Sequence, residues 1–254
     1  MNIGTAKRTT NRLLAFLSAG LDRVRLEHPS NARRHHLNCQ DVDGLDCETR
    51  KVLNLLDYTK NSGSDYAATT FESAYHTIRL GPHEFAGQRN PWQRLAGVPF
   101  TFDGATVLDI GCNQGGMLFC LKDRIREGIG VDYDHRMINA AHGVRAFNSA
   151  NNLHFYVFDL EKEDLDLLMN FIPSQGVDIV ILLSMCMWIR NWRAVIRKAR
   201  EIAPCLLFET NGAHQQQKDQ VSFVRQQFVS VDLIRDSSPD DPGQKARRLY
   251  ICRR

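Results

Sequence analysis

The chain has 254 residues, of which 43% are hydrophobic and 24% charged, and its formal net charge is +3 at pH 7. This composition is that of an ordinary globular protein, and no apolar run reaches the roughly 18–20 residues that a membrane-spanning helix needs. The small positive charge does not by itself indicate a nucleic-acid partner. Seven cysteines without a CxxC pair indicate buried free thiols and a reducing compartment, so we expect a cytoplasmic protein with no membrane partner.

The first hundred residues contain two stretches with helical spacing of apolar residues, at 11–26 and 48–59. The basic and apolar residues 7–17 faintly resemble a signal peptide, but charged residues follow at once, which favours an amphipathic helix. We therefore expect residues 1–95 to form a helical N-terminal extension or cap. Residues 96–254 are then the main domain.

The polar stretch between these helical patterns contains His35, His36, Cys39 and Cys47. Four such side chains suggest zinc ligands, but their spacing matches no compact zinc motif. Aspartate and asparagine neighbours indicate a polar loop instead. We expect no metal site.

From residue 106 onward, short β-rich runs alternate with helical patterns, which predicts βαβ units and a parallel sheet. The last two runs are separated only by a short loop with two prolines and a glycine, too short for a crossover helix. We therefore expect an α/β fold whose mostly parallel, seven-stranded sheet ends in an antiparallel hairpin. The strand-like runs lie at 106–110, 128–132, 153–158, 177–183, 205–209, 229–234 and 248–252, and helical patterns include 116–125, 135–147 and 192–203.

The stretch VLDIGCNQGG, residues 107–116, is typical of a buried strand that enters a glycine-rich turn and then a helix. Free backbone N–H groups at the positive helix terminus would bind an anion or a polar cofactor tail. Dinucleotide-binding loops carry a glycine at the position of Asn113, where pyrophosphate approaches the backbone closely. Because asparagine accepts left-handed backbone angles, we expect the turn to form but to bind a ligand without pyrophosphate.

Acidic residues end the next two predicted strands. Asp132 lies 21 residues after Gly111, where a carboxylate reaches ribose hydroxyls in nucleotide-binding folds; the alternative is a solvated residue at a strand end. Asp159 could accept a hydrogen bond from an adenine amine, or it could cap a helix that begins near Glu161.

Together these motifs resemble those of class I S-adenosylmethionine-dependent methyltransferases. The loop matches the family's D-x-G-x-G-x-G motif at Asp109, Gly111 and Gly115, with Asn113 as a departure, while GVDYD and FDL match its acidic motifs. The predicted C-terminal hairpin also matches, and the resemblance covers about residues 75–252. It implies a Rossmann-like sheet and S-adenosylmethionine as cofactor.

The resemblance also implies which residues contact the cofactor. The amino-acid end would lie at Asp109, Gly111 and the loop amides, the ribose at Asp132 and the adenine at Asp159. Arg89 lies in segment 75–92, which is rich in histidine, arginine and aromatic residues. It could bind the cofactor carboxylate or an anionic substrate in bidentate fashion, or it could be a solvated linker residue. The full set of candidate contacts is Asp109, Gly111, Cys112, Asn113, Gly115, Asp132, Tyr133, Asp159, Leu160, Ser184 and Arg89.

The acceptor pocket is expected outside the carboxyl ends of the strands. The apolar loop 184–192 would form one wall, and it has Met187 where many relatives have a histidine. Glu209 and His214, after the fifth predicted strand, are the candidate general bases, although His214 could simply begin a helix.

We therefore predict methyl transfer to an oxygen or nitrogen of a small molecule such as a sugar or secondary metabolite. Segment 75–92 loosely resembles the entry segment of both small-molecule and tRNA wobble-uridine methyltransferases. A tRNA-modifying methyltransferase is the alternative, because Arg190, Arg193, Arg197 and Arg200 recur at helical spacing. A dinucleotide-dependent oxidoreductase and a non-enzymatic cofactor-binding scaffold are further alternatives. No feature indicates an oligomeric state.

Overall fold

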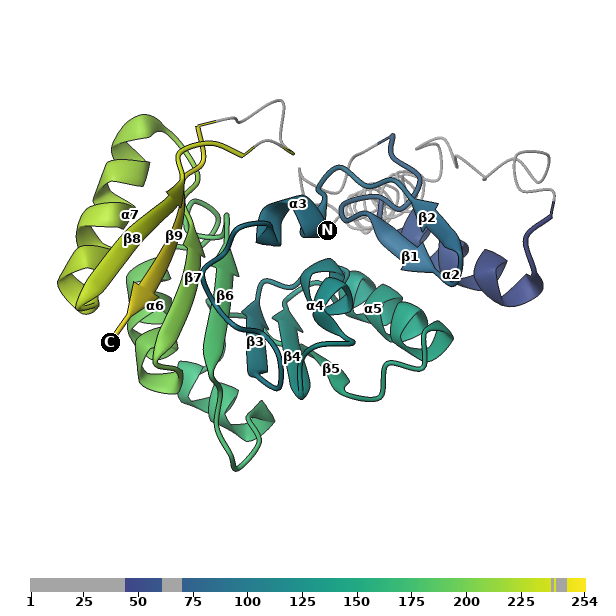
Figure 1. Cartoon of the computed structure of the whole chain (residues 1–254), viewed down its shortest axis with the longest axis horizontal. Helices are drawn as coiled ribbons and strands as arrows, with labels where there is room; N and C mark the ends of the chain where they lie inside the picture. Colours follow the sequence, from purple (N-terminus) through teal and green to yellow (C-terminus); the bar gives the residue numbers. More distant parts are fainter. Residues whose placement is uncertain (1–43, 61–69, 239, 241–245) are drawn as a thin grey trace, which may run out of the picture. The chain divides into compact units, whose positions relative to one another are not determined.

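A computed structural model describes residues 44–60, 70–238, 240 and 246–254 (Figure 1). Residues Leu45–Arg254 form one compact unit. The predicted helix at 11–26 and the candidate zinc ligands His35, His36 and Cys39 lie outside the described residues. The division of the chain at residue 95 stays a prediction.

The main sheet has seven strands in the order β5-β4-β3-β6-β7-β9-β8. Every neighbouring pair from β5 to β7 is parallel, whereas β9 runs antiparallel to both β7 and β8. The predicted Rossmann-like, mostly parallel sheet with a C-terminal antiparallel hairpin is therefore confirmed. The strands are β3 (Thr106–Ile110), β4 (Glu127–Asp132), β5 (Leu153–Val157), β6 (Ile179–Leu183), β7 (Cys205–Glu209), β8 (Ser230–Arg235) and β9 (Leu249–Arg253).

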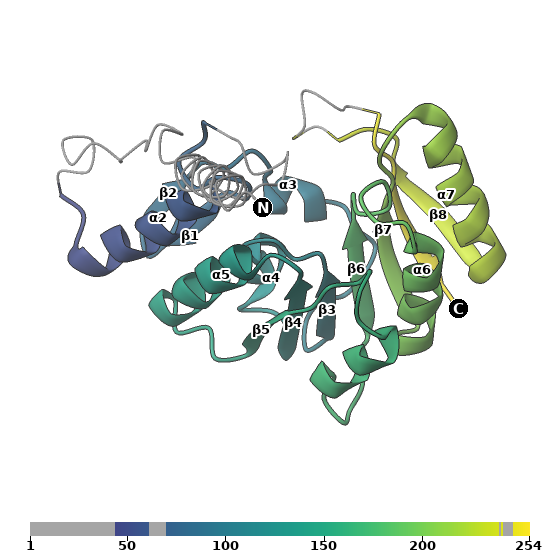
Figure 2. The same cartoon turned by 180° about the vertical axis from the view of Figure 1, so that it is seen from behind.

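Helices cover both faces of the sheet, which explains the continuous apolar runs of its strands. Helices α4 (Gly116–Leu121) and α5 (His135–Phe147) pack on β3, β4 and β5, while α6 (Trp192–Ile202) and α7 (His214–Gln227) pack near β7 and β8 (Figure 2). A 3-10 helix, η1 (Leu165–Phe171), contacts α6. Every residue of β3, β6 and β7 is consequently buried, as expected for strands covered on both faces.

The segment before the sheet combines one predicted helix with a hairpin that the sequence did not predict. Helix α2 (Cys47–Thr59) begins at Asp46, whose carboxylate accepts a hydrogen bond from the Thr49 amide, and it packs against α5. Strands β1 (Ile78–Leu80) and β2 (His83–Phe85) pair antiparallel before the short helix α3 (Pro91–Leu95). Strands this short carry too few residues for an alternating pattern to be recognised.

Strands β4 and β5 lie on one side of β3, whereas β6 and β7 lie on its other side. The connections from β3 and β6 therefore run in opposite directions along the sheet. Loops that leave the carboxyl ends of these two strands diverge, which opens a crevice at that edge of the sheet. The glycine-rich turn after β3, the acidic end of β4 and the loops after β6 and β7 all lie at this edge (Figure 1). The topology thus places the candidate residues of the sequence analysis along one edge.

Candidate functional site

The turn after β3 has the left-handed geometry that its sequence predicted. Gly111, Asn113 and Gly115 have φ angles of 77°, 51° and 78°. The Asn113 side-chain oxygen accepts a hydrogen bond from the Gln114 amide at 2.8 Å, which stabilises a conformation otherwise reserved for glycine. The expectation that asparagine preserves this turn is confirmed.

Both glycines of the turn are also required by packing. A side-chain carbon on Gly111 would lie 2.3 Å from the Met185 sulfur, and one on Gly115 would lie 2.6 Å from the Phe155 ring. Such distances are far below ordinary van der Waals contact. The loop backbone is therefore held close to its neighbours even without a ligand.

Asp132, at the end of β4, is fixed against this turn. One carboxylate oxygen accepts from the Asn113 amide and the other from the Asp134 amide, both at 2.9 Å. Burial raises the pKa of Asp132 to about 6, against the lowering effect of these hydrogen bonds. Each oxygen retains a further lone pair, so the carboxylate is oriented to accept hydrogen bonds from a diol.

Asp109, the last acidic residue before the turn, lacks the partners that Asp132 has. Its side chain is buried, and its Oδ2 atom makes no hydrogen bond to any described residue. Burial raises its pKa to about 7, with Arg94 opposing this rise and Asp132 adding to it. Because a buried polar atom without a partner is costly, the site lacks a hydrogen-bond donor that a ligand would supply.

The raised pKa of Asp109 makes folding stability depend on pH. The folded state holds this proton more tightly than an unfolded chain, whose aspartate pKa is about 4, so the stabilisation is complete below pH 4 and is lost as pH rises through about 7. We expect Asp109→Asn to be more stable than the wild type by roughly 2 kcal/mol at pH 8, with a smaller difference at pH 5. Urea unfolding at both pH values measures this. Exposed Asp123→Asn is the control, and an equal response of both variants would contradict the expectation.

The other predicted cofactor contacts differ in their surroundings. The Asp159 carboxylate accepts from the Lys162 side chain at 2.7 Å and from the Glu161 amide at 3.0 Å, and these bonds lower its pKa despite partial burial. These contacts stabilise a turn at residues 160–162, but no helix begins near Glu161, so the expected helix cap is not formed. The adenine contact stays a prediction. Cys112 and Leu160 are buried, while Tyr133 is half-exposed.

Glu209, at the end of β7, lies in a buried ion cluster that we call the Glu209 cluster (Arg89, Arg94, Ser184, Glu209 and Arg247). Arg94 donates to the Glu209 carboxylate at 2.6 Å, Arg89 lies 3.5 Å from it, and the Ser184 hydroxyl also donates to it. Burial alone would raise the pKa of Glu209, but the arginines outweigh it and lower the pKa to about 2. Such a carboxylate is a weak base, so this geometry favours anchoring over the predicted proton abstraction.

Arg89 makes a bidentate contact of the predicted kind, but its partner is Asp240 of the same chain. Its Nε and Nη2 atoms donate to the two Asp240 oxygens at 2.8 and 3.2 Å. Arg247, which precedes β9, donates to the Ser184 hydroxyl at 2.9 Å and so joins the cluster. A contact between Arg89 and the cofactor carboxylate or an anionic substrate stays a prediction.

The sequence analysis missed three residues that link the N-terminal segment to the turn. The Gln114 side chain donates to Thr59 of α2 at 2.7 Å and accepts from the His76 amide at 3.1 Å. The His76 ring packs on Gly116, its Nδ1 has no partner among the described residues, and burial with nearby Arg94 holds its pKa well below the ordinary value. The concentration of histidine, arginine, aromatic and glycine residues in segment 75–92 was the available signal. It does not indicate which of these residues reach the turn.

His214 is the exposed first residue of α7, as the helix-start alternative proposed. The preceding residue, Ala213, lines a pocket of about 270 Å³ at the carboxyl ends of β6 and β7. The predicted base therefore lies beside a cavity at the expected edge of the sheet. The pocket is lined by Met187, Gly212, Ala213, Gln217, Ala246 and Arg247.

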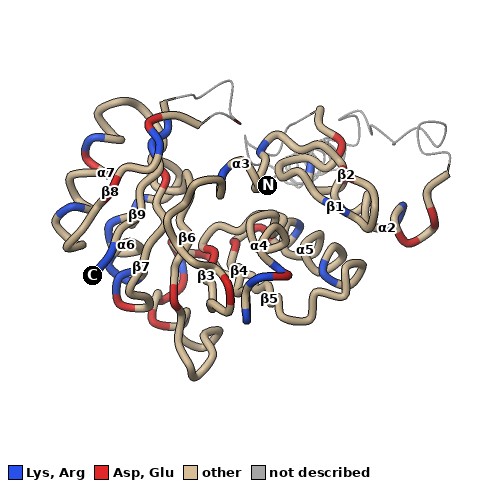
Figure 3. Tube along the Cα trace, viewed as in Figure 1, with Lys and Arg blue, Asp and Glu red and all other residues tan. Residues whose placement is uncertain are grey.

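The arginine-rich face of α6 is partly engaged within the chain. The Arg193 guanidinium lies 4.2 Å from the Trp192 ring centroid, and that of Arg197 lies 5.2 Å from the Phe223 centroid. Acidic residues are interspersed with basic ones around this helix (Figure 3). Two of the four arginines thus stack on aromatic rings of the chain itself, which is a structural use of these residues.

The described part of the chain shows neither a metal site nor a membrane-spanning helix. No cluster of three or more histidine, cysteine or acidic side chains there could hold a metal ion. None of its helices has the length and hydropathy to cross a membrane. Its cysteines are all free.

Comparison with known proteins identifies the domain. The family described as a methyltransferase domain matches residues 84–235, more than half of the chain. The chain belongs to this methyltransferase family. The predicted class I S-adenosylmethionine-dependent methyltransferase is confirmed, and its cofactor is S-adenosylmethionine. A dinucleotide-dependent oxidoreductase is therefore set aside.

Solved structures share the fold of this methyltransferase at low sequence identity. The bifunctional kinase-methyltransferase WbdD matches with a TM-score of 0.56 and 16% identity over 77% of this chain and 45% of its own. The N-terminal domain of EvdMO1, crystallised in the presence of SAH and D-fucose, matches with 0.54 and 14% over 70% and 89%. The chain spans less than half of the whole WbdD and EvdMO1 chains, the latter at 43%. No curated protein matches the sequence.

Proposed function

We propose that this methyltransferase transfers a methyl group to an oxygen or nitrogen of a small-molecule acceptor, a sugar or secondary metabolite. The pocket of about 270 Å³ beside the Glu209 cluster carries this proposal. Its volume lies just below the roughly 300–1,000 Å³ typical of pockets for drug-sized ligands. It lies at the carboxyl ends of β6 and β7, at the same edge of the sheet as the glycine-rich turn.

The residues at the turn fit the cofactor. The unpartnered Asp109 carboxylate would bind the ammonium of its amino-acid end, and Asp132 would accept hydrogen bonds from its ribose hydroxyls. When bound, S-adenosylmethionine supplies an electrophilic methyl group on a sulfonium. The chain must then align the acceptor and exclude water.

The lining of the acceptor pocket suits a polar small molecule. Gln217 and Arg247 provide hydrogen-bond donors, and Met187 and Ala246 provide apolar wall. The EvdMO1 domain was crystallised in the presence of D-fucose, which supports a sugar as the acceptor class.

Turnover of the purified full chain tests the proposal. Formation of S-adenosylhomocysteine from S-adenosylmethionine is expected with a monosaccharide among a panel of small acceptors. Ala246→Trp should block the pocket and remove this turnover without changing the affinity for S-adenosylhomocysteine, whereas Ala146→Trp on exposed α5 surface should do neither. Methylation of tRNA alone, weakening steeply with salt, would establish the tRNA alternative. Cofactor binding without any turnover would indicate a scaffold.

His214 is the general base in this proposal. It follows Ala213, which lines the pocket, and in this proposal its imidazole accepts a proton from the acceptor. We expect His214→Ala to lower kcat about 100-fold at neutral pH, with unchanged stability because the side chain is exposed. Steady-state kinetics across pH measure this, and His214→Gln is the conservative control. An unchanged kcat and pH profile would show that no base acts from this position.

A further inference from the structure

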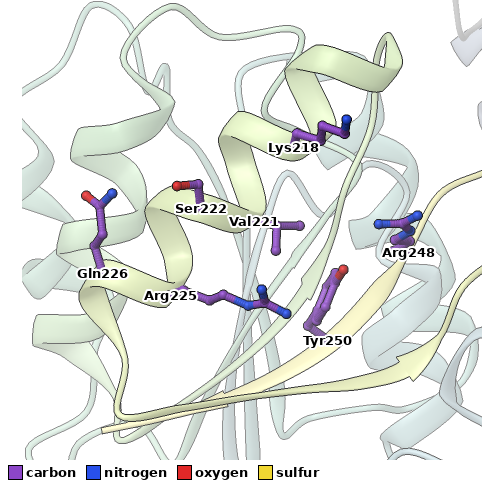
Figure 4. A pocket seen from close by; sticks show the side chains of 7 residues that line it. All are labelled: Lys218, Val221, Ser222, Arg225, Gln226, Arg248 and Tyr250. Carbon is purple, nitrogen blue, oxygen red and sulfur yellow. The ribbon is translucent and has the colours of Figure 1, made fainter.

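A second cavity lies between α7 and β9, and it shares no residue with the acceptor pocket. This groove of about 480 Å³ is not used by the proposed reaction. Five of its residues follow helical spacing along α7, so one face of that helix forms a wall (Figure 4). It is lined by Lys218, Val221, Ser222, Arg225, Gln226, Arg248 and Tyr250.

Three cations line this groove, and no acidic residue does. Lys218, Arg225 and Arg248 are exposed and form no ion pair with any described residue. Lys198 on α6 differs, because it binds two carboxylates, each at 2.5 Å. Positive charges gathered in a concave space without counterions favour the binding of an anion.

Tyr250 lines the groove and contributes a hydroxyl group to it. The residue is 3% exposed, and its hydroxyl makes no hydrogen bond within the described part of the chain. The phenol oxygen points toward the end of the groove where Arg248 lies, and Arg225 reaches toward the ring (Figure 4). Because the hydroxyl opens onto the groove, it can donate a hydrogen bond to an oxygen atom of a ligand there.

We propose that this groove binds the phosphate group of a small phosphorylated molecule. Two guanidinium groups and an ammonium would match the charge of a phosphate and several of its acceptor oxygens. The hydroxyls of Ser222 and Tyr250 add donors, and Val221 with the Tyr250 ring provides an apolar surface for the rest of the ligand. The site lies apart from the glycine-rich turn, so it acts in addition to cofactor binding.

Calorimetric titration of the full chain with inorganic pyrophosphate and with ADP tests this site. We expect saturable binding that Arg225→Gln/Arg248→Gln weakens about 100-fold, because each arginine contributes roughly tenfold. Tyr250→Phe should weaken it about five-fold. The control Arg190→Gln/Arg200→Gln removes the same charge from exposed sites on and near α6 and should leave the affinity unchanged. Affinity for S-adenosylhomocysteine should be unchanged in every variant, which shows that each is folded.

Three results would overturn the proposal. These are no binding of either probe, equal weakening by the control variant, and binding of a single-stranded oligonucleotide without binding of pyrophosphate or ADP. Because cofactor affinity is measured in the same samples, failure of this site is distinguishable from failure of the proposed methyl transfer.

Discussion

Asp132→Ala is expected to weaken the binding of S-adenosylhomocysteine at least about 100-fold. The Asp132 carboxylate holds the Asn113 and Asp134 amides, each at 2.9 Å, so the substitution removes both the acceptor for the ribose and the support of the turn. Two charge-assisted hydrogen bonds to a ligand are together sufficient for a loss of this size. Isothermal titration calorimetry measures it.

Two further variants separate these contributions. Asp132→Asn retains one acceptor oxygen and should bind with intermediate affinity, while exposed Asp123→Ala should bind as the wild type does. Unchanged affinity of Asp132→Ala would show that the ribose lies elsewhere.

Glu209→Ala is expected to lower the free energy of unfolding by about 3–5 kcal/mol. The substitution leaves Arg94 buried, at 4% side-chain exposure, without its carboxylate partner. Arg89, at 1% exposure, keeps only Asp240. A buried charge without its counterion is costly because water no longer solvates it. Denaturant unfolding at pH 7, far above the Glu209 pKa of about 2, measures the change.

An exposed ion pair provides the matched comparison. Glu84 and Arg79 are about half-exposed and 2.7 Å apart, so Glu84→Ala should cost less than about 1 kcal/mol. Glu209→Gln, which retains hydrogen-bonding atoms, should fall between the two. If Glu209→Gln kept full stability but lost turnover, Glu209 would be the general base rather than an anchor.

The strands, the glycine-rich turn and the acidic end of β4 could be predicted because their signals are local in the chain. Continuous apolar runs indicated covered parallel strands, and the loop after the penultimate strand was too short for a crossover helix. Asn113 could be assigned a left-handed conformation from residue type and position, and its φ of 51° bears this out. In each case neighbouring residues carry the information, through backbone sterics and the periodicity of burial.

The Glu209 cluster and the α7–β9 groove were decided only by the tertiary structure. Arg94 and Glu209 are 115 residues apart, and Arg89 and Asp240 are 151 apart. Nothing in the residues around Arg89 distinguishes a buried anchor from a solvated linker arginine, and nothing around Lys218 or Arg248 reveals that they face one groove. Ion pairs and cavities depend on which side chains the packed sheet and helices bring together, because charge and shape complementarity act through space rather than along the chain.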